Sequence, residues 1–78
     1  MRILDVDSDR SLSRVILYLT ADEVGEMRSA LDAIRLDHGG HEHVASIDYK
    51  KEITVCVYDP STVDGFSERS KRLIVEDV

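Results

Sequence analysis

Residues 14–34 read RVILYLTADEVGEMRSALDAI, and their hydrophobic pattern changes from that of a strand to that of a helix at Thr20. Positions 15–19 are all apolar, so both of the faces that alternate along a strand carry apolar side chains. This arrangement is typical of a central strand or of a sheet covered on both sides. The stretch therefore predicts a strand at about residues 14–20 that leads directly into a helix.

The helix pattern opens with the spacing of a capping box. Thr20 can accept a free backbone N–H of the first turn, and Glu23, three residues later, can reach back to the cap. An apolar stripe then recurs at steps of three and four residues, formed by Val24, Met27, Leu31 and Ile34. The sequence HGG at 38–40 is a typical stop signal, so we expect the helix to end there.

A β-hairpin is predicted on each side of this helix. Upstream, a short strand at about residues 2–6 is followed by an Asp/Ser-rich turn and then by the strand at 14–20. Downstream, HEHVASID (41–48) and KEITVCVYD (51–59) read as two strands joined by a polar tip at residues 48–51. We therefore expect four antiparallel strands.

The tail, GFSERSKRLIVEDV (65–78), fits two structures. An apolar helical stripe with Ser67 as its cap is formed by Phe66, Ser70, Leu73 and Ile74. RLIVEDV (72–78) taken alone could instead be a further strand. The cap and the stripe together favour the helix.

These elements predict an α+β fold, a two-layer sandwich in the order β-hairpin, helix, β-hairpin, with a short C-terminal helix or strand. The main helix should cover one face of a four-stranded antiparallel sheet. The chain has 78 residues, 42% of them hydrophobic, which suffices for one small core, so we expect a single domain over residues 1–78. A core of this size leaves stability marginal, and association with a copy or a partner would add to it.

Charge and composition narrow the range of partners. Acidic residues number 16 against 10 basic ones, and the net charge of −6 repels a phosphate backbone, so we expect no binding to nucleic acid. The single cysteine excludes an internal disulfide. No apolar run is long enough to span a membrane, which predicts a cytoplasmic protein without a membrane partner.

The three histidines form the one cluster with metal-ligand character. His41 and His43 are two residues apart on a predicted strand, so both could offer an imidazole to one divalent ion such as zinc or nickel. A third ligand would have to come from a spatial neighbour such as His38, Cys56 or an acidic residue. Depending on the register of the second hairpin, His43 would lie near Cys56 or near Val55. The competing interpretation is that His38 ends the helix and that the pair lines a solvated strand face.

Other motifs give no catalytic pattern. DVDSDR (5–10) has the alternating acids that open a calcium loop, but Arg10 replaces the required glycine and Ile16 the bidentate glutamate. Cys56 lies inside a strand pattern, where a thiol is typically inert. Phosphate-binding and nucleophile-elbow motifs are absent from the sequence. We expect no enzyme activity and no bound cofactor, and a small enzyme of unknown reaction is kept as an alternative.

The second face of the predicted sheet carries the candidate interface, formed by Ile16, Tyr18, Cys56 and Tyr58. Either the stripe of the tail or another chain would cover it. The leading expectation for function is a small acidic module for protein–protein interaction or regulation. It would act as a homodimer, or as an antidote or inhibitor that covers a basic partner. The alternative is a metal-binding protein that uses the pair His41 and His43.

Overall fold

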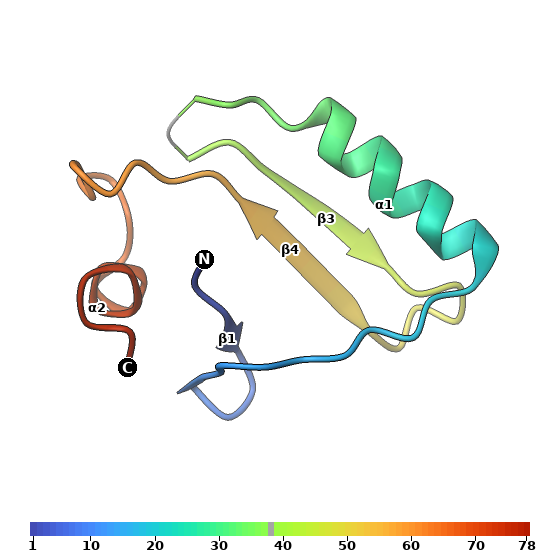
Figure 1. Ribbon diagram of the computed structural model, residues 1–78, viewed down its shortest axis with the longest axis horizontal. Coiled ribbons are helices and arrows are strands. Elements are labelled where there is room, and N and C mark those ends of the chain that lie inside the picture. The colour runs from blue at the N-terminus through green and yellow to red at the C-terminus, as the bar shows by residue number, and fades with distance from the viewer. Residues whose placement is uncertain (38) are drawn as a thin grey trace. The chain divides into compact units, whose positions relative to one another are not determined.

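The computed structural model describes residues 1–37 and 39–78 and has the α+β class expected from the sequence. Its elements, in chain order, are β1 (Leu4–Asp5), β2 (Arg10–Ser11), α1 (Ala21–Ala33), β3 (His41–Ala45), β4 (Glu52–Cys56) and α2 (Glu68–Glu76) (Figure 1). The chain divides into two compact units. The central unit is Tyr18–Tyr58, and the terminal unit combines Met1–Leu17 with Asp59–Val78.

In the central unit, α1 begins at the predicted capping box. The Thr20 hydroxyl accepts the backbone N–H of Glu23 at 3.2 Å, and the Glu23 carboxylate accepts the backbone N–H of Thr20 at 2.9 Å. The second carboxylate oxygen of Glu23 accepts the backbone N–H of Ile47 at 3.0 Å. These N–H donors, Thr20 first, hold the pKa of Glu23 below its ordinary value. One side chain therefore caps the helix and ties it to the turn between β3 and β4.

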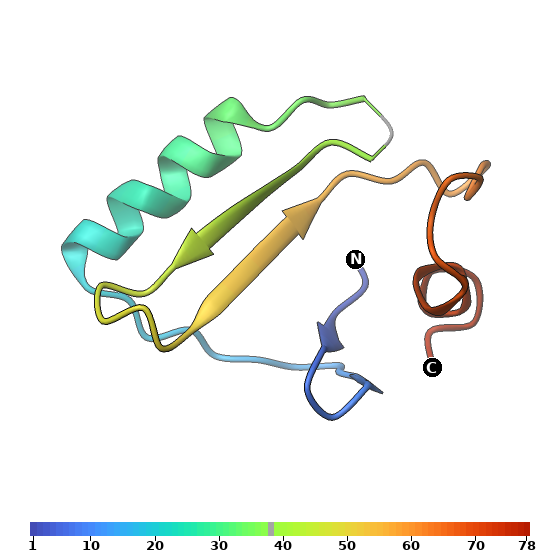
Figure 2. The same cartoon turned by 180° about the vertical axis from the view of Figure 1, so that it is seen from behind.

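The core of the central unit lies between α1 and the β3–β4 hairpin. Half-buried and exposed residues alternate along both strands, as the period of two in a strand requires. The half-buried apolar side chains include Met27 and Ala30 of α1, Ile34 directly after the helix, and Val44, Ile53 and Val55 of the hairpin. Two opposite views show α1 alongside β3, on the side of the hairpin away from β4 (Figures 1 and 2). The helix therefore covers the β3 side of the hairpin.

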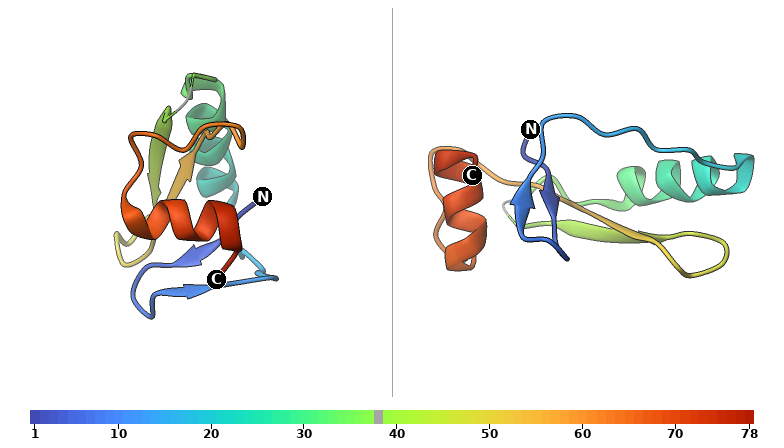
Figure 3. Two further views of the ribbon diagram at one scale, coloured as in Figure 1. Left: turned by 90° about the vertical axis from the view of Figure 1, so that its left-hand side faces the viewer. Right: turned by 90° about the horizontal axis from the view of Figure 1, so that it is seen from below.

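In the terminal unit, α2 lies beside the short β1–β2 hairpin (Figure 3). Arg2, just ahead of β1, donates from Nε to the carbonyl oxygens of Leu73 and Ile74 at 3.0 and 3.2 Å. A cation at the C-terminal end of a helix is favourable, because the aligned peptide dipoles give that end a partial negative charge. The Leu73 side chain, 8% exposed, is the most deeply buried hydrophobic residue in the described part of the chain.

Side-chain hydrogen bonds join the hairpin of the terminal unit to α2 at two further points. Arg69 of α2 donates to the Asp9 carboxylate at 2.6 Å, and the Ser11 hydroxyl donates to the Asp77 carboxylate at 3.0 Å. The helix itself begins after Ser67, whose hydroxyl accepts the backbone N–H of Ser70 at 3.1 Å. The predicted C-terminal helix and its cap are thus confirmed.

The predicted four-stranded sheet is wrong. The described residues form two separate two-stranded antiparallel sheets, β1 with β2 and β3 with β4, and no strand lies at 14–20. The cause is the turn at residues 6–9: the Asp5 carboxylate accepts the backbone N–H of Asp7 at 3.1 Å and the hydroxyl of Ser8 at 2.8 Å. This turn reverses the chain at once, so Leu4 pairs with Ser11 rather than with a residue of the 14–20 segment.

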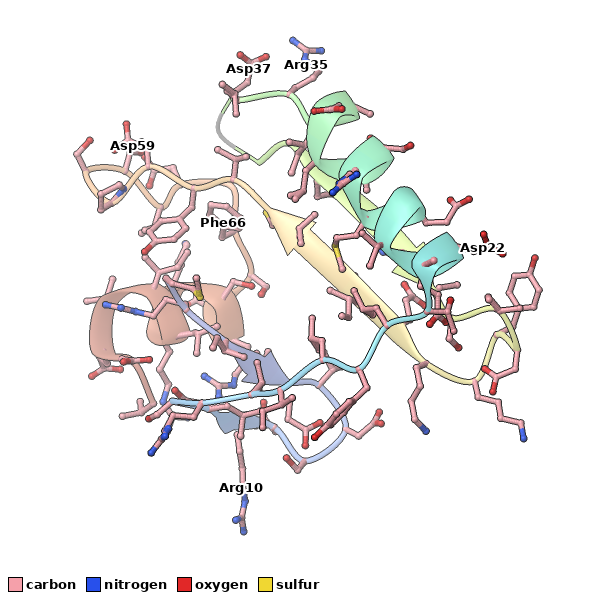
Figure 4. All side chains as sticks on the ribbon, turned by 45° about the vertical axis from the view of Figure 1, so that its right-hand side comes forward. Arg10, Asp22, Arg35, Asp37, Asp59 and Phe66 are labelled. Atoms are coloured by element: carbon pink, nitrogen blue, oxygen red, sulfur yellow. The ribbon has the colours of Figure 1, made fainter. Side chains whose placement is uncertain are left out.

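The end of α1 also differs from the prediction. The helix stops at Ala33, several residues before HGG, and His38 lies outside the described residues. The two glycines instead extend the β3–β4 ladder: Gly39 donates to the carbonyl oxygen of Val57 at 2.9 Å, and Val57 donates to that of Gly40 at 2.7 Å. Arg35 and Asp37 form an exposed ion pair in the connection (Figure 4).

Candidate functional site

The exposed face of the β3–β4 hairpin carries the chemistry-bearing residues of the predicted site. In the observed register His41 pairs with Cys56, and His43 pairs with Thr54. Neither of the two registers considered for the hairpin is observed, because Thr54, rather than Cys56 or Val55, lies opposite His43. Because paired residues on adjacent strands point to the same face, both histidines and the cysteine share one exposed face.

Backbone hydrogen bonds at both ends of the hairpin fix which of its pairs are closest. Val57 donates to the carbonyl oxygen of Gly40, and Ser46 donates to that of Lys51, both in the same register. Hydrogen-bonded and non-hydrogen-bonded pairs alternate along an antiparallel ladder. The pairs of His41 with Cys56 and of His43 with Thr54 are therefore non-hydrogen-bonded pairs, in which the side chains approach most closely.

Both imidazole rings use Nδ1 for contacts within the protein. The Nδ1 of His43 lies 2.8 Å from the Thr54 hydroxyl and 2.9 Å from a carboxylate oxygen of Glu52. The Nδ1 of His41 lies 3.2 Å from the carbonyl oxygen of Gly39. The ring centroids are 5.4 Å apart, and the rings meet edge to face at 82°.

Cys56 points away from a shared site in this structure. Its thiol donates to the carbonyl oxygen of Val57 at 3.6 Å, although the side chain is exposed on the same face as the histidines. Among residues 1–37 and 39–78, no three histidine, cysteine or acidic side chains are grouped at metal-binding distances. The structure thus brings together His41 and His43 and adds Thr54 and Glu52, which sequence reasoning missed because only the register places them beside His43.

The apolar run at residues 15–19 is the second feature of functional interest. Ile16 and Tyr18 are 77% and 90% exposed, and the neighbouring Val15, Leu17 and Leu19 are also exposed. Residues 13–19 form no hydrogen bond with any residue that the structure describes. Of the other predicted interface residues, Cys56 is exposed and Tyr58 is half-buried. The four-residue interface itself stays a prediction.

The basic residues of α2 are engaged in ion pairs. Arg69 pairs with Asp9, and the other two pairs lie within the helix, with N–O distances of 3.4 and 4.0 Å, between Lys71 and Glu68 and between Arg72 and Glu76. Their neighbours balance the positive charge, as in a solvated helix face.

No helix in the described part of the chain is both long and apolar enough to cross a membrane. Comparisons with protein-family models, with curated proteins and with solved structures found no match.

Proposed function

We propose that this chain is a protein-interaction module that pairs with a second copy of itself through the 15–19 run. The observation that supports the proposal most strongly is the exposure of five consecutive apolar side chains on a segment that forms no hydrogen bond with the described residues. Burying an aliphatic or aromatic side chain of this size is worth about 1.5–3 kcal/mol. A contiguous exposed run of this kind is a recognised mark of an interaction surface.

The backbone of the run supports pairing as well as packing. The backbone N–H and C=O groups of residues 13–19, which have no hydrogen-bond partner among residues 1–37 and 39–78, can form a ladder with another extended segment, which is how sheet edges associate. A second copy offers an identical segment, and an antiparallel pair of identical segments closes a two-fold symmetric dimer. The chain also gains from added burial, because Leu73 is the deepest hydrophobic residue of the described core at 8% exposure.

Sedimentation of a matched pair of double variants tests this proposal. Ile16→Ser with Tyr18→Ser removes two exposed apolar side chains of the run. Ile47→Ser with Tyr49→Ser removes the same residue types at the same spacing from the turn between β3 and β4, where they are 58% and 85% exposed.

We expect the unchanged chain and the turn variant to form a dimer and the run variant to stay monomeric. A chain that is monomeric at all accessible concentrations contradicts the proposal. Equal weakening of the dimer by both variants also contradicts it, because the run would then have no special part.

A second candidate function is inhibition of a basic partner. The net charge of −6 favours it, since an acidic surface attracts a basic protein and speeds their association. In that case the run would contact the partner in place of a second copy. Neither candidate assigns the chain a reaction of its own.

A further inference from the structure

The exposed face of the β3–β4 hairpin holds two imidazoles in an arrangement that suits a metal ion. His41 and His43 point from the same face of β3, and their ring centroids are 5.4 Å apart. Two imidazoles bound through nitrogen to one ion, with metal–nitrogen distances near 2 Å, have centroids roughly 5 Å apart. The observed centroid spacing is therefore close to that of two imidazoles that share one ion.

Hydrogen bonds decide which nitrogen of each ring is free to bind. A carbonyl oxygen can only accept, so the contact with Gly39 places the proton of the His41 ring on Nδ1. The carboxylate of Glu52 likewise accepts from Nδ1 of His43. In a neutral ring with its proton on Nδ1, the lone pair is on Nε2.

We infer that His41 and His43 together bind a divalent transition-metal ion through their two Nε2 atoms. Histidines that ligate metals in proteins typically donate their other ring N–H to a carboxylate or a backbone carbonyl, and both rings do so here. Imidazole nitrogen suits nickel and zinc, whereas magnesium takes oxygen ligands. This site is independent of the proposed pairing through the 15–19 run.

The remaining coordination positions belong to water. Both histidine side chains are exposed, so water reaches the ion, and no third histidine, cysteine or acidic ligand is grouped with them among the described residues. The thiol of Cys56 is turned to the carbonyl oxygen of Val57. A two-imidazole site of this kind binds one ion per chain and is weaker than a site with four protein ligands.

Calorimetric titration with nickel chloride tests the assignment on the whole chain. We expect one nickel ion per chain, and His41→Ala and His43→Ala should each weaken binding at least about tenfold, the loss seen even for outer partners of metal-bound histidines. Cys56→Ser on the same face is the matched control and should leave the affinity unchanged. Magnesium chloride should neither bind nor compete.

Nuclear magnetic resonance of the imidazole nitrogens gives a second measurement, which does not depend on the heat of binding. Addition of zinc chloride should shift Nε2 of both rings while Nδ1 keeps its proton. Three results overturn the assignment: no nickel binding by the unchanged chain, undiminished binding when both histidines are replaced, or a tenfold loss in Cys56→Ser. Circular dichroism of each variant should show that the exposed substitutions leave the fold intact.

Discussion

Gly40 occupies a position at which a side chain would collide with the backbone. A Cβ at Gly40 would overlap the carbonyl oxygen of Arg35, in the connection between α1 and β3. Gly25, in the interior of α1, has open space where its Cβ would be. The same substitution should therefore have opposite effects at the two sites.

Gly40→Ala should destabilise the chain by about 1–3 kcal/mol, the usual cost of forcing atoms into an occupied space. Gly25→Ala should stabilise it by about 0.5–1 kcal/mol, because alanine loses less conformational entropy in a helix. Urea unfolding followed by circular dichroism measures both changes. A neutral Gly40→Ala would show that the connection after α1 can move aside.

At the scale of the element, Glu23 makes the anchoring of α1 sensitive to acid. Its pKa is lowered in the folded chain, mainly by the backbone N–H of Thr20 and then by that of Ile47. A carboxylate with a lowered folded-state pKa contributes stability that is complete above its unfolded pKa and lost as the pH falls through the folded one. The Ser46 hydroxyl lowers the pKa of Asp48 in the same way, so its contribution has the same sign.

We therefore expect the urea concentration at the unfolding midpoint to decrease as the pH is lowered from neutral to about pH 3, because carboxylates become protonated over this range. Glu23→Gln should lower the midpoint at neutral pH, since the amide replaces one of the two accepting oxygens with an NH2 group that cannot accept an N–H. The same substitution should also reduce the decrease of the urea midpoint at acidic pH. Glu26→Gln, at an exposed position of α1, is the control, and its urea midpoint should decrease in acid as much as that of the unchanged chain. An equal fall in both variants would assign the acid sensitivity to other carboxylates.

Elements with a local cause could be predicted from the sequence, and elements with a distant cause could not. The capping box of Thr20 and Glu23 and the cap of Ser67 depend on residues three positions apart, and both were found where expected. The prediction of a strand at 14–20 is wrong, because a run of apolar residues indicates a preference for burial but does not specify which strand it pairs with. The turn after Asp5 gave β1 a nearer partner.

The candidate site divides in the same way. The spacing of His41 and His43 placed both on one strand face, which the structure shows. The partners of His43 depend on the register of the β3–β4 hairpin, which the alternation of apolar side chains restricts but does not fix alone, because the geometry of the turn also sets it. The metal and the four-residue interface stay predictions.

At the scale of the whole molecule, the net charge separates the two proposed modes of association. Two copies that each carry −6 repel one another, and salt screens that repulsion beyond a Debye length of about 10 Å at 0.1 M. Salt should therefore strengthen a dimer formed through the apolar 15–19 run. Salt should weaken binding to a basic partner, because it screens the attraction between the opposite charges of the two proteins.

Sedimentation at rising sodium chloride concentration measures the dimer dissociation constant directly. A constant that falls with salt agrees with pairing of the run between copies. A dimer that dissociates as salt rises must be held by opposite charges, and this result would contradict the apolar interface. The single domain over residues 1–78 stays a prediction, and one cooperative unfolding transition in the same samples would support it.

The division of the chain sets an order for folding during synthesis. The central unit is continuous from Tyr18 to Tyr58, so all its contacts can form before the residues that follow have left the ribosome. The terminal unit needs Arg2 to reach the carbonyl oxygens of Leu73 and Ile74, a closure across nearly the whole sequence. Contacts between such distant residues form slowly, because the intervening chain must first be ordered or closed into a loop. A nascent chain that stalls before α2 is synthesised would therefore contain a folded central unit and a β1–β2 hairpin that lacks its contacts with α2.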